Sequence, residues 1–129
     1  MILGFTGTRT ESDVSPNRKK EIIDFLVENK DKISYVVHGG AAGLDTFIHD
    51  VCNKLDIPKF VRPAYIKSRL PGIYGQALPK DPLERNKDIV NDCDMLLAVP
   101  RSPNKEEIKS GTWHTIRYAK SLNKKIHFI

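Results

Sequence analysis

The sequence predicts an α/β protein of the Rossmann-like, three-layer type, with a mainly parallel five-stranded sheet and helices on both faces. Short apolar runs alternate along the chain with longer segments in which apolar residues recur at helical spacing. One of these runs, at residues 95–99, is apolar at every position, which is typical of a strand covered on both faces. Small polar turns stand where strands end or helices begin, as expected for parallel strands joined by right-handed crossovers.

Five apolar segments are expected to form the strands, and they cover residues 1–5, 33–37, 59–61, 94–100 and 126–129. Four other segments have the periodicity of helices. In the first, Ser15 and Pro16 suit the N-cap and the first helical position. The second is expected to begin near Gly43 or Leu44.

The third helix carries a different start signal. Asp81 is expected as its N-cap, with Pro82 at the first helical position and Glu84 reaching back to the cap. This interpretation makes Glu84 a capping residue rather than a catalyst. The fourth helix is expected to open at Ser110.

Composition describes one globular domain over residues 1–129, with 40% hydrophobic and 29% charged residues. The apolar runs are too short to span a bilayer and the N-terminus lacks the layout of a signal peptide, so a cytoplasmic location and no membrane partner are expected. Cys52 and Cys93 lie in separate segments without CxxC spacing, which predicts reduced, partly buried thiols. The net charge of +5 weakly favours an anionic partner.

The chain is organised around a glycine-rich turn at residues 39–43, between an apolar strand and a helix. Its glycines allow a sharp turn and a close approach by a ligand. The N–H groups and the positive dipole end of the following helix favour an anion there. Asp45, in the first helical turn, either accepts from a ribose hydroxyl or only favours the helix terminus. The alternative for the whole turn is a tight connection without a ligand.

Three further segments are expected to reach the same edge of the sheet, because ligands in such sheets bind at the carboxyl ends of the strands. These are the polar residues after the first strand, Arg85 in the third helix, and the start of the fourth helix. The ligand-binding residues expected from this convergence are Thr6, Gly7, Thr8, Arg9, Gly39, Gly40, Ala41, Gly43, Asp45, Arg85, Asn86, Ser110, Gly111, Thr112 and Trp113. No catalytic residue is assigned.

Several other site classes fit poorly. The glycine turn lacks the GK[ST] ending of a P-loop and does not match GxGxxG. The four histidines show no ligand spacing, and Ser110 lacks a GxSxG elbow, so neither a metal site nor a hydrolase triad is expected. No cofactor is expected.

The aperiodic segment at residues 62–81 contains prolines, glycines, Lys67, Arg69 and Tyr74. Ordered loops of this length are often lids, binding loops or interfaces, and the alternative is a surface excursion. Either Tyr65 or Trp113 is a candidate for stacking on a base, while Trp113 alternatively belongs to the core or to a subunit contact. A homodimer or higher oligomer is a corresponding expectation.

With these residues in view, almost the whole chain resembles the SLOG superfamily. That superfamily includes LOG-type cytokinin-activating phosphoribohydrolases, the DNA-processing protein A and small stand-alone nucleotide-binding proteins. The resemblance depends on the order and spacing of four motifs: Gly7-Thr8-Arg9, Gly39-Gly40-Ala41-Ala42-Gly43-Leu44-Asp45, Glu84-Arg85-Asn86 and Ser110-Gly111-Thr112. It implies a Rossmann-like fold that binds a nucleotide-derived ligand, with the glycine turn and Gly111-Thr112 at phosphate and Arg85 near phosphate or ribose.

LOG-type enzymes carry a glutamate in the pattern PGGxGTxxE, and here Thr115 takes its place. Because the carboxylate is missing, the leading hypothesis is capture of a nucleotide, cyclic nucleotide or ADP-ribose-like signal for sensing or sequestration. One alternative is N-glycosidic cleavage of a nucleoside monophosphate, with Asp45, Glu84 or a partner chain supplying the carboxylate. Single-stranded DNA binding of the DNA-processing type ranks third, because it calls for exposed aromatic residues.

Overall fold

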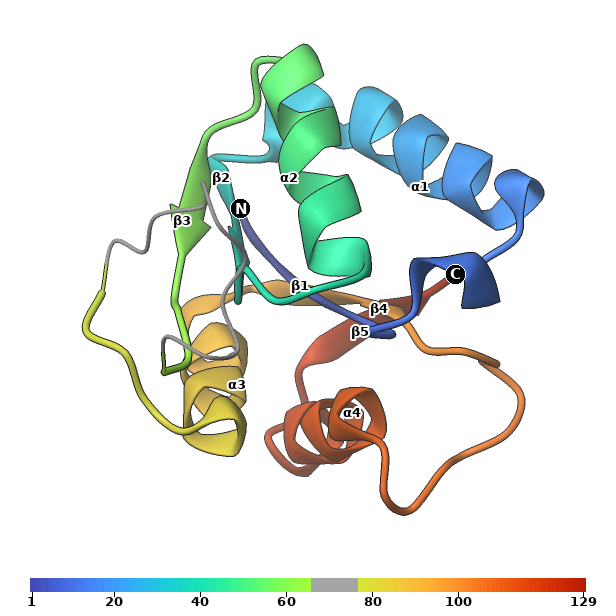
Figure 1. Ribbon diagram of the computed structural model, residues 1–129. Coiled ribbons are helices and arrows are strands. Elements are labelled where there is room, and N and C mark those ends of the chain that lie inside the picture. Colours follow the sequence, from blue (N-terminus) through green and yellow to red (C-terminus); the bar gives the residue numbers. More distant parts are fainter. Residues whose placement is uncertain (66–76) are drawn as a thin grey trace.

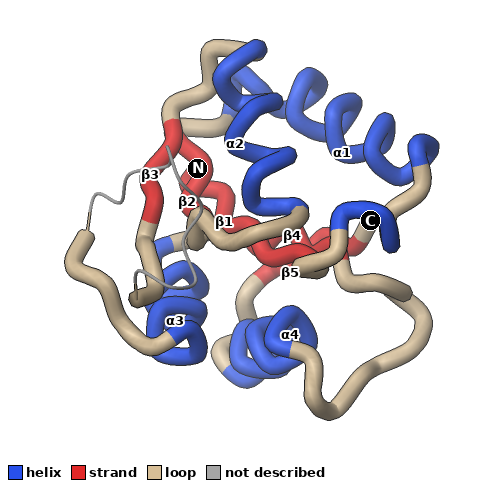
Figure 2. Tube along the Cα trace, viewed as in Figure 1, coloured by secondary structure: helices blue, strands red, loops and turns tan. Residues whose placement is uncertain are grey.

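A computed structural model describes residues 1–65 and 77–129 of the chain. Its centre is a five-stranded sheet in the order β3-β2-β1-β4-β5, and every strand pair is parallel (Figures 1 and 2). The strands are β1 (Ile2–Gly7), β2 (Tyr35–His38), β3 (Lys59–Val61), β4 (Met95–Val99) and β5 (Lys125–Phe128). The helices are α1 (Pro16–Asn29), α2 (Leu44–Lys54), α3 (Pro82–Asp92) and α4 (Gly111–Ser121), with 3₁₀ turns η1 (Glu11–Asp13) and η2 (Lys30–Lys32). The predicted α/β class is confirmed.

The helices form two layers around the sheet, with α1 and α2 on one face and α3 and α4 on the other (Figure 1). Alternate side chains of the central strands pack against the two helical layers. Leu3 and Phe5 of β1 belong to the core under α1 and α2, whereas Leu96 of β4 packs with Ile89 and Ala119 of the opposite layer. Burial on both faces explains the continuous apolar run at residues 95–99.

The strand order places a topological switch point between β1 and β4. From β1 the chain adds β2 and then β3 on one side, and it later adds β4 and β5 on the other side. Connections therefore leave the carboxyl ends of β1 and β4 in opposite directions. In open α/β sheets this divergence creates the crevice in which ligands bind.

The expected end of the first strand is wrong by two residues. Thr6 and Gly7, expected in a turn, continue β1, because they pair with Ala98 and Val99 of β4. The main-chain pairing with β4, rather than side-chain polarity, decides where this strand ends. β3 has its expected bounds, whereas β2, β4 and β5 differ from theirs by a residue or two at either end. The 3₁₀ turns η1 and η2 were not expected.

The expected N-cap of α1 is confirmed, and Ser110, where the fourth helix was expected to open, is the N-cap of α4. The hydroxyls of Ser15 and Ser110 accept hydrogen bonds from the backbone N–H groups of Arg18 and Trp113, both at 3.2 Å. Gly43 stands at the N-cap position of α2, as expected, with a positive φ of 88°.

The capping box at α3 is not formed. Asp81 occupies the N-cap position and Pro82 the first helical position, but the Asp81 side chain makes no capping hydrogen bond. Glu84 pairs instead with Lys87 at 3.8 Å. Both carboxylates are exposed to solvent and line the cavity described below.

Cys52 and Cys93 are free thiols, and both are buried completely rather than partly. Burial raises the pKa of Cys52 to about 11, so the group stays a neutral thiol. No helix of the described residues is long and apolar enough to cross a membrane. Of the segment at 62–81, residues 66–76 lie outside the described part, so the expectations for Lys67, Arg69 and Tyr74 fall outside it too.

Candidate functional site

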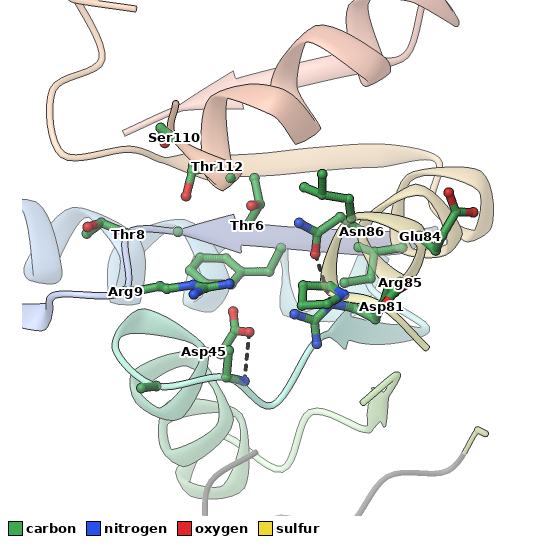
Figure 3. A pocket seen from close by; sticks show the side chains of 18 of the residues that line it. Thr6, Thr8, Arg9, Asp45, Asp81, Glu84, Arg85, Asn86, Ser110 and Thr112 are labelled. Atoms are coloured by element: carbon green, nitrogen blue, oxygen red, sulfur yellow. Dashed lines mark hydrogen bonds between the residues drawn. The ribbon is translucent and has the colours of Figure 1, made fainter. Parts of the chain in front are cut away.

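A cavity of about 790 Å³ opens at the carboxyl end of the sheet, at the switch point (Figure 3). Four segments line it: residues 5–9 at the end of β1, residues 41, 42 and 45 at the start of α2, residues 81–86 and 89 of α3, and residues 109–112 at the start of α4. This volume is typical of sites that enclose small organic ligands. The predicted convergence of distant segments is thus present in the structure.

Three helices present their N-termini to this cavity. Lining residues include Asp45 in the first turn of α2, Pro82 at the start of α3 and Gly111 at the start of α4. Each helix has 11 residues, so each N-terminus carries unpaired N–H groups and a partial positive charge. Arg9, Arg85 and Lys109 add three cationic side chains to the same lining. The cavity therefore favours an anionic group.

Arg85 is the buried cation of this cavity, with only 4% of its surface exposed. Its Nη1 donates to the backbone carbonyls of Gly39 at 2.6 Å and Arg62 at 3.2 Å, and its Nε donates to Oδ1 of Asn86 at 2.9 Å. All three acceptors are neutral. Within residues 1–65 and 77–129, no carboxylate forms an ion pair with Arg85, and its Nη2 makes no hydrogen bond. A buried charge without a counter-charge is costly, so a bound anion would stabilise it.

Gly39 is required for the position of Arg85. A Cβ at this residue would overlap the guanidinium group of Arg85. The glycine was expected to allow close approach by a ligand, whereas the structure shows that a side chain of the protein itself approaches. The first glycine of the turn therefore makes room for the cation that faces the cavity.

Gly43 connects the glycine turn to the end of β1. Its φ of 88° favours glycine, and a Cβ there would collide with the backbone of Arg9. The next residue, Leu44, donates its N–H to the carbonyl of Thr8 at 3.2 Å. The start of α2 is thereby fixed beside the segment that carries Arg9.

Asp45 is a buried carboxylate in the cavity wall, 9% exposed. Its Oδ2 accepts the N–H of Ala41 at 3.1 Å (Figure 3). Burial raises the pKa of Asp45 to about 6, although the N–H of Ala41 and the charges of Arg85 and Arg9 act in the opposite direction. Burial also lowers the pKa of Arg85, and Asp45 opposes that shift.

Most of the predicted site residues line the cavity. Those that do are Thr6, Gly7, Thr8, Arg9, Ala41, Asp45, Arg85, Asn86, Ser110, Gly111 and Thr112. The predicted residues outside the described lining are Gly39, Gly40, Gly43 and Trp113. The loop amides are also partly engaged inside the protein, since Gly40 donates to Nδ1 of His38 at 2.9 Å and Ala41 donates to Asp45.

Trp113 is a core residue in this structure. It is 4% exposed, packs with Ala98 and Ile116, and lies 6.1 Å from the ring of Phe128 between centroids. Of the alternatives for Trp113, the structure shows the core, and stacking on a base is not supported. Tyr65, the other candidate for stacking, is exposed and lies outside the described lining.

Sequence reasoning missed a pair of histidines behind the glycine turn. Nε2 of His38 lies 3.0 Å from Nδ1 of His49, and Nδ1 of His38 accepts the N–H of Gly40. Because Nδ1 of His38 accepts, its proton resides on Nε2 and is donated to His49. Burial lowers the pKa of His38 to about 3, so the ring stays neutral at physiological pH. Their spacing of eleven residues carries no signal, because the contact joins β2 to α2.

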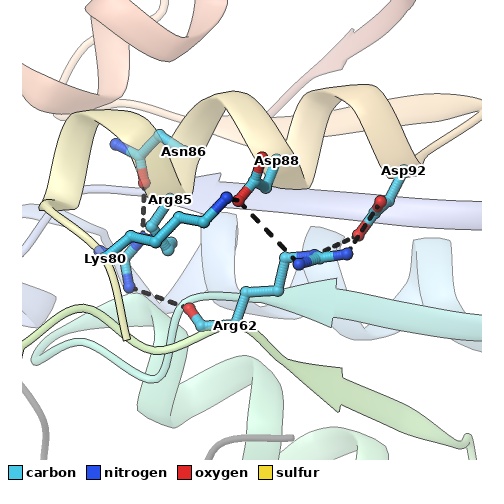
Figure 4. A network of polar contacts seen from close by, with 6 residues as sticks. All are labelled: Arg62, Lys80, Arg85, Asn86, Asp88 and Asp92. Carbon is cyan, nitrogen blue, oxygen red and sulfur yellow. Dashed lines mark hydrogen bonds and ion pairs between the residues drawn. The ribbon is translucent and has the colours of Figure 1, made fainter. Parts of the chain in front are cut away.

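A polar network on the other side of Arg85 was missed as well (Figure 4). The guanidinium of Arg62 binds both carboxylate oxygens of Asp92, through Nε and, at 3.2 Å, through Nη2. Asp88 lies 4.0 Å from Arg62 and 2.7 Å from Nζ of Lys80. The network ties the residue after β3 to α3, which carries Arg85.

Thr115, which occupies the place of the LOG-type glutamate, does not line the described cavity. It is 1% exposed, and its hydroxyl donates to the carbonyl of Gly111 at 2.9 Å. The carboxylates that do line the cavity are Asp45, Asp81 and Glu84.

Among the described residues, no group of three or more histidine, cysteine or acidic side chains is placed to hold a metal ion. No family model, curated protein or solved structure matches this chain.

Proposed function

We propose that the protein binds a nucleotide-derived ligand in the cavity at the carboxyl end of its sheet, for sensing or sequestration. The observation that carries this proposal is the buried guanidinium of Arg85, which forms no ion pair with any carboxylate of the described residues. A protein that folded only for stability would gain from replacing such a charge by an apolar side chain. An anionic ligand group supplies the partner that the fold leaves out.

The other side chains that line the cavity suit the sugar and the base of such a ligand. Thr6, Thr8, Ser110 and Thr112 offer hydroxyl groups, and Asn86 offers an amide, around a space large enough for a sugar and a base. The start of α4, with the positive end of the helix dipole, favours phosphate oxygens. The position at a switch point of the sheet is the one at which nucleotides bind in open α/β folds.

Native mass spectrometry of the freshly purified protein is the first test, followed by thermal shift with nucleotides, cyclic dinucleotides and ADP-ribose isomers. Arg85→Met removes the charge while keeping an apolar stem, and Arg85→Lys keeps the charge without the forked donor. We expect a ligand that stabilises the wild type, and an affinity about 10- to 100-fold weaker in Arg85→Met, because a hydrogen bond to a charged group contributes about 1.5–3 kcal/mol.

Lys20→Ala serves as the matched control. Lys20 is an exposed residue of α1 that pairs with Asp24, and the change removes one positive charge outside the described cavity lining. An equal loss of affinity in this variant would mean that net charge, not the Arg85 site, attracts the ligand. No response of the wild type to any nucleotide would overturn the proposal, and a salt-dependent gel shift would then favour single-stranded DNA.

Cleavage of an N-glycosidic bond is the second candidate, because three carboxylates line the cavity. Asp45, with a pKa of about 6, has the protonation behaviour of a general acid or base. Analysis of the recovered ligand separates the two functions. An intact ligand supports binding, whereas free base and sugar phosphate would identify an enzyme.

A further inference from the structure

Asp45 and Arg85 place opposite buried charges on the wall of one cavity (Figure 3). Both side chains are more than nine-tenths buried, at 9% and 4% exposure. They form no ion pair with each other, yet each shifts the pKa of the other in the direction expected for nearby opposite charges. An anion that completes the coordination of Arg85 therefore lies within electrostatic reach of Asp45.

We infer that an anion enters this cavity together with one proton, which is held by the carboxyl group of Asp45. The inference rests on the proposed function and describes the regulation of that same site. Its physical reason is repulsion, since an ionised carboxylate and a bound anion in one buried space disfavour each other. Protonation of Asp45 removes one of the two negative charges.

Protonation also changes what Asp45 offers to a ligand. Oδ2 already accepts the N–H of Ala41 at 3.1 Å, and the backbone of Gly39 also favours the ionised carboxylate. An ionised carboxylate can only accept, whereas a protonated carboxyl group can donate to an anionic oxygen. In the protonated state Asp45 and the guanidinium of Arg85 are both donors toward the cavity.

The other charged groups of the described lining do not replace Asp45 in this role. Asp81 and Glu84 at the start of α3 are exposed, so solvent screens their repulsion. Arg9 after β1 and Lys109 before α4 are exposed cations, which attract an anion instead of repelling it. His38, which holds the neighbouring Gly40, remains neutral across this range because its pKa is about 3.

The pKa of Asp45 supports the inference. Burial places it at about 6 in the free protein, so the proton needed for anion binding is available near neutral pH. Above that pH the free site is ionised, and each further pH unit is expected to weaken anion binding by up to about tenfold. Below it, the affinity becomes independent of pH.

The experiment uses two probes that do not titrate between pH 5.5 and 8, sulfate and ADP-ribose, on the full chain. Dissociation constants are measured at pH 6, 7 and 8 at constant ionic strength, for the wild type and for Asp45→Asn. Calorimetry in two buffers of different ionisation enthalpy counts the protons taken up. We expect wild-type affinity to fall by about 10- to 100-fold from pH 6 to 8, with proton uptake approaching one at pH 8.

Asp45→Asn is expected to bind with an affinity that does not depend on pH and to show no proton uptake. Asp24→Asn, on the exposed side of α1, is the charge-matched control and is expected to keep the wild-type pH dependence. A circular dichroism spectrum and an unfolding transition verify that both variants are folded. Should Asp45→Asn fail to fold, proton uptake by the wild type still decides the question.

The outcomes separate this inference from the proposed function. Binding with equal affinity at pH 6 and 8, without proton uptake, would overturn proton linkage and leave nucleotide binding in place. Weaker binding of Asp45→Asn at every pH would overturn it as well, because it would show the carboxylate accepting from a ligand hydroxyl. Failure of sulfate, ADP-ribose and the nucleotide panel to bind at any pH would refute the proposed function itself.

Discussion

The backbone carbonyl of Arg62 accepts a hydrogen bond from Nη1 of Arg85 at 3.2 Å, while the Arg62 side chain binds Asp92 at the far end of the same helix that carries Arg85. Arg62 thus contacts α3 at two places (Figure 4). Its main chain fixes the cation of the cavity, and its side chain fixes the helix. Among the described residues, Nη2 of Arg85 makes no hydrogen bond, so it is the donor that the proposed anion would engage.

Arg62→Ala is expected to weaken ligand binding without removing any group that lines the cavity. The ion pair with Asp92 is about one quarter exposed, so its loss lowers the free energy of unfolding by about 1 kcal/mol. The carbonyl of residue 62 then moves more freely and positions Arg85 less well. Chemical denaturation and ligand titration measure the two effects.

Asp92→Asn tests the same link from the other side. If the pair acts as a unit, the double variant is expected to lose little more affinity than either single variant. Additive losses would show that Arg62 and Asp92 act separately. A wild-type affinity in all three variants would contradict a positioning role.

Gly39→Ala is expected to displace Arg85. The added Cβ overlaps the guanidinium group, and the backbone of residue 39 has no positive φ that would itself forbid alanine. Overpacking of this kind lowers the free energy of unfolding by about 1–3 kcal/mol. Binding is expected to weaken as in Arg85→Met, since the same donors are lost.

Gly111→Ala is the control for the effect of Gly39→Ala on stability. A Cβ at this position meets no atom within 4 Å, so the free energy of unfolding is expected to stay within about 0.5 kcal/mol of the wild type. Thermal or chemical unfolding of the two variants in parallel makes the comparison. Equal stability losses would show that the Arg85 contact does not explain the glycine at position 39.

The layered fold could be predicted from the sequence because its signals are local. Apolar runs and helical periodicity identified the four α-helices and the five strands of the described residues, although not the strand order that locates the switch point. Arg85 was also found, because it lies in the first turn of a helix at the ligand edge of the sheet. The hydrogen bonds of Arg85 could not be predicted, since two of the acceptors are backbone carbonyls of Gly39 and Arg62, far away in the chain.

The contacts that the sequence could not reveal all join different elements. His38 meets His49 across β2 and α2, and Arg62 meets Asp92 across the end of β3 and α3. Trp113 illustrates the reverse problem, because its place next to a polar turn suggested a ligand contact. Its position on α4 instead directs the side chain of Trp113 to the core. Local patterns predict where a residue lies along an element, but not which distant residue it meets.

His38→Asn is expected to make the protein more resistant to acid. The pKa of His38 is about 3 in the folded protein and about 6.5 when unfolded, so between these values the unfolded chain binds a proton that the folded chain does not. The wild type therefore loses stability through this group as pH falls from 6.5 to 3, by at most about 1.4 kcal/mol per pH unit. Asparagine can still accept the N–H of Gly40 but does not titrate.

Urea denaturation of His38→Asn and wild type at pH 7, 5 and 4 measures this difference. The variant is expected to be the less stable protein at pH 7, because the hydrogen bond to His49 is lost. Its free energy of unfolding should then decline less than that of the wild type toward pH 4. Parallel pH profiles for the two proteins would show that His38 does not stay neutral when folded.

Asp45→Asn is expected to change the pH dependence of the free energy of unfolding in the sense opposite to His38→Asn. The pKa of Asp45 is about 6 in the folded protein against 3.8 when unfolded, so between these values the folded chain binds the extra proton. This group stabilises the fold fully below pH 3.8, and the contribution is lost as pH rises through 6. At pH 8 the wild type carries a buried carboxylate that asparagine avoids, so the variant is expected to be more stable by up to about 3 kcal/mol. This gain in stability should vanish near pH 4, and urea denaturation of both proteins at pH 4 and pH 8 measures it. A variant that is less stable than the wild type at pH 8 would contradict the prediction. It would mean that the ionised carboxylate is well solvated in the folded state and that the cavity holds enough positive charge to keep Asp45 ionised.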